Sequence, residues 1–98
     1  MAQELRLVLI PPITVVDRAA RNVNLPIGAI VRGLVADQGD TYAVIQADWS
    51  LETAQRTFSA VRSRAPLSPA EIAGAYVGTF ATYRQEAGPE VYHLFEVA

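Results

Sequence analysis

The chain has 98 residues, of which 51% are hydrophobic and 18% are charged, and its formal net charge is −2. It contains no Cys, no Lys and one His, which excludes thiolate nucleophiles, disulfides, cysteine-bound metals and lysine Schiff bases. The apolar fraction excludes a disordered chain, and the length suits one domain that spans residues 1–98.

The first segments of the chain are separated by proline. Residues 5–10 are predicted to form a strand, and because only Arg6 interrupts its apolar residues we expect it to be buried on both faces. A Pro-Pro pair ends this strand, since prolyl nitrogens cannot donate to a β-ladder. Residues 13–16 are expected to form a short extended segment, and the more polar residues 17–26 a loop.

Two β-rich segments, residues 29–36 and 41–47, flank the sequence Asp-Gln-Gly-Asp at 37–40. This pattern predicts a β-hairpin with a glycine-containing turn. The alternative is a helix over residues 26–38 that ends at Gly39. Two glycines and four β-branched residues within that stretch disfavour the helix, so we prefer the hairpin.

An amphipathic helix is predicted over residues 51–64. Ser50 is suited to capping its first amides, and two arginines stand near its end, where the helix dipole favours cations. Apolar residues recur at helical spacing along one face, and they are Leu51, Ala54, Phe58, Val61 and Ala65.

A second helix is predicted to begin at Ser68, because Pro69 suits the first helical position and Glu71 completes a capping box. Two ends are possible for this helix. It either stops near residue 75 and is followed by a strand over 76–83, or continues to residue 87 before Gly-Pro. Glycine, valine and threonine in the segment favour the short helix and the strand.

Residues 90–97 are predicted to form the last strand, with Tyr92 and Leu94 on one face and His93 and Phe95 on the other. Together the elements predict an α+β domain. We expect a small antiparallel sheet of four or five strands with one or two helices packed on one face.

Candidate functional residues are few. His93 suits acid–base chemistry, but no serine, cysteine or metal-ligand pattern accompanies it, so a core or interface position is favoured over a catalytic one. Tyrosine and tryptophan are enriched at protein interfaces. Trp49, Tyr83 and Tyr92, together with His93, are therefore the candidate binding residues, and no catalytic residue, metal ligand or cofactor is expected.

The charged fraction lies below the roughly 25% that is usual for soluble domains, so the surface is either lightly charged, with 16 alanines raising the apolar fraction, or partly covered by a partner, and we prefer the second explanation. We expect a non-enzymatic structural or protein-interaction module that acts as a homo-oligomer or as a subunit of a larger assembly. The alternative is a small-ligand-binding protein or a cofactor-independent enzyme with a pocket near His93.

The partners expected from the sequence are proteins, either another copy or other subunits of an assembly. A negative net charge argues against nucleic acid, and no apolar run approaches the ~18 residues of a membrane span. Absence of Cys fits a reducing compartment. We therefore expect the protein in the cytoplasm or in a soluble particle.

Overall fold

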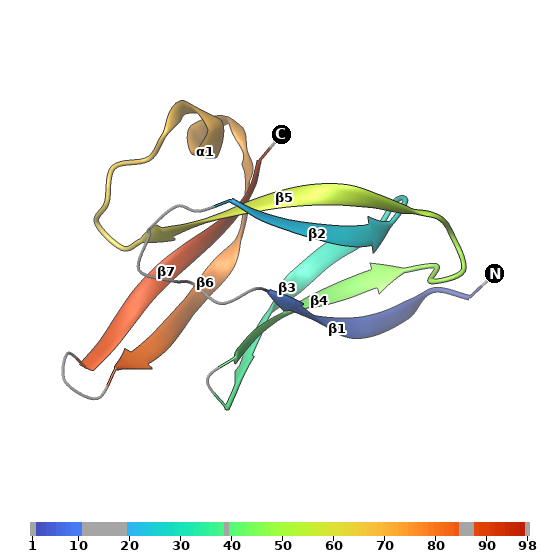
Figure 1. The fold of residues 1–98 in the computed structure, drawn as a ribbon, viewed down its shortest axis with the longest axis horizontal. Helices are drawn as coiled ribbons and strands as arrows, with labels where there is room; N and C mark the ends of the chain where they lie inside the picture. Colours follow the sequence, from blue (N-terminus) through green and yellow to red (C-terminus); the bar gives the residue numbers. More distant parts are fainter. Residues whose placement is uncertain (1, 11–19, 39, 85–87, 98) are drawn as a thin grey trace.

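The computed structural model describes residues 2–10, 20–38, 40–84 and 88–97. These residues form two antiparallel sheets and one short helix (Figure 1). Sheet A has the order β1-β4-β3 and consists of β1 (Glu4–Ile10), β3 (Ile30–Asp37) and β4 (Asp40–Ala47). Sheet B has the order β2-β5-β7-β6 and consists of β2 (Arg21–Pro26), β5 (Thr53–Arg62), β6 (Ala75–Arg84) and β7 (Gly88–Val97).

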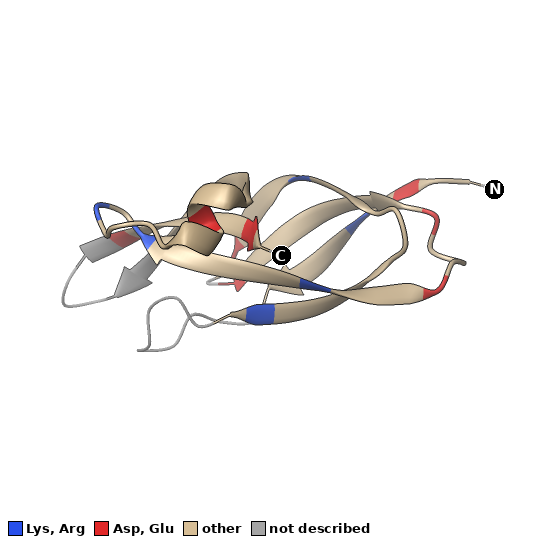
Figure 2. Ribbon diagram, turned by 90° about the horizontal axis from the view of Figure 1, so that it is seen from above, with Lys and Arg blue, Asp and Glu red and all other residues tan. Residues whose placement is uncertain are grey.

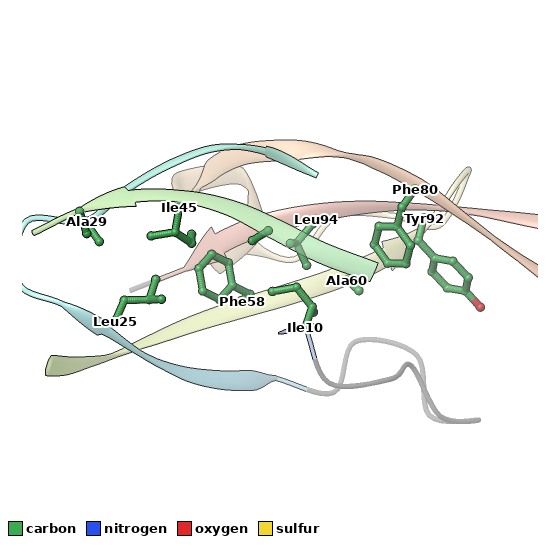
Figure 3. Packing of buried hydrophobic residues seen from close by; sticks show 11 residues of the cluster. Ile10, Leu25, Ala29, Ile45, Phe58, Ala60, Phe80, Tyr92 and Leu94 are labelled. Atoms are coloured by element: carbon green, nitrogen blue, oxygen red, sulfur yellow. The ribbon is translucent and has the colours of Figure 1, made fainter. Parts of the chain in front are cut away.

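The hydrophobic core lies between the two sheets. Leu25 and Phe58 of sheet B point toward Ile45 of sheet A (Figure 3). The inner face takes every second residue of each strand, as the pleat requires. Its buried members are Ile10, Leu25, Ala29, Ala43, Ile45, Ala47, Phe58, Ala60, Phe80, Tyr92 and Leu94. The molecule is flat, with extents of 47 × 32 × 17 Å, so much of each outer face stays close to solvent.

The predicted α+β class is wrong. The described residues are mostly strand, and α1 (Pro69–Ala73) is their one helix, with five residues. Two sheets of three and four strands replace the predicted single sheet covered by helices. The core is therefore closed by a second sheet, while α1 lies over only part of the outer side of sheet B (Figure 2).

The predicted helix over residues 51–64 is a strand, and this error accounts for most of the wrong class. β5 pairs with β2 on one side and with β7 on the other. Phe58 and Ala60 satisfy the strand period toward the core, while Phe58 and Val61 also satisfy a helical period. The segment forms a strand because β2 and β7 pair with both of its edges, and this long-range pairing outweighs its helical spacing. Ser50 caps no helix; its amide and hydroxyl donate to Asp48 Oδ1 at 3.1 and 2.6 Å.

Two N-terminal expectations are also corrected. Residues 21–26 are not loop but strand β2, which places Leu25 in the core opposite Ala54 of β5. β1 is a strand as predicted, but it is buried on one face only, because sheet B covers only the inner side of sheet A. The extended segment expected at 13–16 lies outside the described residues.

Several local predictions are confirmed. β3 and β4 form the expected hairpin, with Asp37 paired to Asp40. Helix α1 has the complete capping box: Glu71 N donates to Ser68 Oγ at 3.3 Å, and Ser68 N donates to Glu71 Oε1 at 2.8 Å. The chain then enters strand β6, which excludes the longer helix. No helix among the described residues is long and apolar enough to cross a membrane.

Candidate functional site

The outer side of sheet A carries a row of exposed leucines. Leu5, Leu7 and Leu9 of β1 are 63%, 57% and 48% exposed. Val8 and Ile10, at alternate positions of the same strand, face the core, so the pleat of β1 places its leucines on the opposite, outer side of the sheet. Because leucine is the residue type that a core normally takes, three in a row on an open face require an explanation.

The row continues across the sheet. Leu7 is paired with Val44 of β4 and Leu9 with Tyr42, and both partners are half-buried. We call this surface the apolar face of sheet A, and it is formed by Leu5, Leu7, Leu9, Ile30, Val35, Tyr42 and Val44. Within the described part of the chain, no element packs over it, and only β4 pairs with β1.

Polar groups close one end of the apolar face. Arg32 Nε donates to Gln46 Oε1 at 2.8 Å, and Gln46 Nε2 donates to Gln3 Oε1 at 2.7 Å. The β3–β4 register shifts between Val31 and Gly33, and this irregularity leaves Arg32 outside the regular pairing. The side chain therefore lies on the outer side of the sheet, beside Gln46.

Two carboxylates occupy the opposite end of the apolar face. Asp37 and Asp40 face each other across the hairpin, and both are exposed. They share the alternation of Tyr42 and Val44, so their side chains project from the outer side of the sheet. Like charges directly opposite each other in a sheet are destabilising. A cation from outside the hairpin would relieve this repulsion.

Trp49 is placed at the turn between β4 and β5 and packs against the edge of the core. Its indole Nε1 donates to Glu4 O at 3.0 Å, and the Arg6 guanidinium lies 4.9 Å from the ring centroid. Hydrogen bonds from the hydroxyl and amide of Ser50 lower the pKa of the neighbouring Asp48. These contacts attach the start of β1 to the turn, which is a structural use of the tryptophan.

Tyr92 is 2% exposed and belongs to the core. Its ring stacks on Phe80 with centroids 5.7 Å apart, and its hydroxyl donates to Glu90 Oε2 at 2.8 Å. Arg21 is buried nearby on the inner face, where burial lowers the pKa of its guanidinium and a smaller electrostatic contribution from Tyr92 acts in the opposite direction. A side chain enclosed in this way offers no surface to a partner.

His93 faces the other side of sheet B, among hydroxyl groups. Its Nδ1 lies 2.9 Å from Thr79 Oγ1 and 3.3 Å from Tyr76 OH, and those two hydroxyls also contact each other. Its Nε2 lies 3.4 Å from Ser63 Oγ. A serine hydroxyl beside a histidine is part of the arrangement found in Ser-His-Asp catalytic triads. In such a triad a carboxylate accepts a hydrogen bond from histidine Nδ1 and orients the ring, whereas here Nδ1 faces the hydroxyls of Thr79 and Tyr76.

A shallow hollow lies beside Ser63. Its volume is about 330 Å³, and its lining residues are Arg62, Ser63, Arg64, Glu90 and Val91. His93 is not among them, so the imidazole reaches the hollow only through Ser63. Arg64, in the turn that follows β5, adopts a left-handed backbone conformation with φ of 77°.

The four candidate residues do not converge on one site. Tyr92 and His93 point to opposite faces of β7, and Trp49 belongs to the turn after β4. The backbone of Tyr83 pairs with Pro89, and its side chain lies outside the described residues. The leucines of β1 were missed as surface residues, although their two-residue spacing was the signal that they share a face.

Among the described residues, no group of three or more histidine, aspartate and glutamate side chains is placed to hold a metal ion. No protein-family model, curated protein or solved structure matches the chain.

Proposed function

We propose that the protein is a non-enzymatic interaction module that docks on another protein chain through the apolar face of sheet A. The observation that carries this proposal is the row of Leu5, Leu7 and Leu9, each about half exposed or more on an open sheet. Apolar patches with polar rims are typical of protein–protein contacts. The polar ends formed by Arg32 and by Asp37 fit this pattern.

Covering this face would supply hydrophobic free energy that favours association. Full burial of a leucine is worth about 1.5–3 kcal/mol, so covering what remains exposed of the three leucines yields about 2.5–5 kcal/mol per chain. The other apolar residues of the face add to this. β1 also has one edge that no described strand occupies, which a partner strand could extend.

A protein is a better partner for this surface than nucleic acid. The net charge is −2, and the charged positions of the described residues are spread over the strands, the turns and α1 (Figure 2). Phosphate binding requires clustered cations, whereas the apolar face offers Arg32 alone. We place this activity in the cytoplasm or in a soluble particle, as the lack of cysteine suggests.

The test compares Leu7→Glu with Ile72→Glu. Ile72 is 69% exposed on α1, so it controls for adding one charge at an exposed apolar position outside the apolar face. Molar mass by light scattering and fluorescence of a hydrophobic dye are measured for both variants and the wild type. We expect only Leu7→Glu to lower the mass or the dye signal. Identical values for all three proteins would refute the proposed function.

A second candidate rests on the contact between Ser63 and His93 beside the hollow. This pair would make a weak cofactor-independent hydrolase, with the serine hydroxyl as nucleophile and the imidazole as base. Turnover of an activated ester that falls at least tenfold in both Ser63→Ala and His93→Gln supports it. Turnover that is unchanged in either variant rejects it.

A further inference from the structure

We infer that the occupant of the apolar face is a second copy of this chain, stacked on it as a two-fold dimer. This inference rests on the proposed function and names the partner. In the dimer, the outer sides of two copies of sheet A face each other with their strands antiparallel. The arrangement is isologous, so each contact occurs twice.

Charge complementarity is the first argument for a second copy. The apolar face has a cation at one end, Arg32, and two carboxylates at the other, Asp37 and Asp40. Arg32 and Asp37 are about 16 Å apart along β3, given about 3.3 Å per residue. A two-fold axis across the strands, midway between these ends, brings each Arg32 to the acidic pair of the other copy. The partner then places a cation beside the two opposed carboxylates of the hairpin.

The apolar surfaces match under the same axis. The rotation keeps the lateral order of the strands, so β1 lies over β1 and β3 over β3 of the other copy. By the strand register this axis crosses β1 near Val8, so Leu7 and Leu9 pack on the same two leucines of the partner, and Tyr42 packs near the partner's Val44. Sheets that pack in this aligned way lie about 10 Å apart, with their strands turned by about 30°.

Surface area gives a third argument. The chain exposes 6293 Å², which exceeds by about 800 Å² the roughly 5,500 Å² expected of a monomer with this mass. An interface of standard size buries about 800 Å² on each partner. The flat shape of the molecule thus leaves uncovered about as much surface as one dimer contact removes.

The test is a charge swap between two variants. Arg32→Glu places an acid against the partner's acids, and the double variant Asp37→Asn, Asp40→Arg places a cation against the partner's Arg32. Each variant alone is expected to weaken its homodimer at least tenfold. Mixed in equal amounts, the two variants restore an attractive contact at both ends of the face, because every cation then meets an acid of the other copy. Sedimentation velocity of each variant and of the mixture measures this.

A wild-type dimer, weakened variants and a restored mixed dimer support the inference. A wild type that sediments as a monomer overturns it, as does a mixture no heavier than its components. If the wild type is a monomer whose hydrophobic-dye fluorescence still depends on Leu7, only the second copy is refuted, and the docking surface serves a different protein. If the monomer shows no such dye signal, the proposed function fails as well.

Discussion

Ser59 Oγ donates a 2.6 Å hydrogen bond to Glu71 Oε2, and this contact joins β5 to α1 on the outer side of sheet B. Glu71 is 2% exposed, and its other carboxylate oxygen accepts the amide of Ser68. One side chain therefore completes the cap of α1 and fixes the helix to the sheet. Its burial explains why a helix of five residues is stable here, since so short a helix is not stable alone.

Replacing Glu71 with Ala is expected to destabilise the protein by about 3 kcal/mol, because the buried hydroxyl of Ser59 and the part-buried amide of Ser68 lose their acceptor. Ser59→Ala removes one of these bonds and should cost about 1 kcal/mol. Urea unfolding measures both. A cycle with Glu71→Gln should show coupling between the two sites; additive effects would mean that the Ser59 contact carries no energy.

Gly74 and Gly78 are predicted to differ sharply in their tolerance of alanine. A Cβ at Gly74 would lie 2.5 Å from the backbone oxygen of Glu96, so Gly74→Ala should cost about 2–3 kcal/mol. A Cβ at Gly78 would meet Leu34 Cδ1 at 3.1 Å, the end of a flexible side chain, and should cost less than about 1 kcal/mol.

Gly33→Ala is the matched control for these two glycines, because a Cβ there meets nothing within 4 Å. Thermal unfolding of the three variants ranks them. Equal melting temperatures for Gly74→Ala and Gly33→Ala would contradict the close approach of β7 to the end of α1.

Arg56 is expected to tolerate lysine poorly. Its Nε and Nη2 donate to the two carboxylate oxygens of Glu96 at 2.5 and 2.6 Å, and Nη1 donates to Ala29 O. Hydrogen bonding to Glu96 raises the pKa of this guanidinium, with burial acting in the opposite direction. A lysine cannot make the forked contact, so Arg56→Lys should cost about 1 kcal/mol after allowance for partial exposure.

The comparison for this substitution is Arg6→Lys. Arg6 pairs with Glu4 at 3.1 Å, but both side chains are more than half exposed, so less than about 0.5 kcal/mol should be lost. Chemical denaturation compares the two variants. An equal loss of unfolding free energy at both positions would show that the bidentate contact between Arg56 and Glu96 adds no stability beyond that of an exposed ion pair.

Asp48 should make stability depend on pH in the acid range. Hydrogen bonds from Ser50 lower its pKa below the usual 3.8, so the folded state favours the ionised form. The stabilisation is complete above the pKa of the unfolded chain and is lost as the pH falls through the lower, folded value.

Asp48→Asn removes this titration. The difference in unfolding free energy between wild type and variant should be constant above about pH 5 and shrink as the pH is lowered further. Denaturation at a series of pH values measures it. A difference that does not change with pH would contradict the lowered pKa.

Local signals in the sequence were sufficient where neighbouring residues determine the structure. The capping box from Ser68 to Glu71 depends on side chains three positions apart, and it is present as predicted. The β3–β4 hairpin depends on its own turn and is also present. The alternation in β7 correctly separated Tyr92 from His93.

Long-range pairing decided the elements that were predicted wrongly. Residues 53–62 fit a helical period, but β2 and β7 pair with both edges of this segment. The apolar character of β1 suggested burial on both faces, yet only one face of sheet A has a sheet against it. For Leu7, the sequence shows how apolar the surface is but does not show which side of the sheet is left open.

Labelling of a single thiol tests the covered face most directly. The chain has no cysteine, so Leu7→Cys and Ile72→Cys each give a protein with a single thiol. If two copies stack on the apolar face of sheet A, the thiol at position 7 reacts with a maleimide many times more slowly than the thiol at position 72 at high protein concentration. On dilution, when the dimers separate, the two rates converge. Equal rates at every concentration would contradict the account.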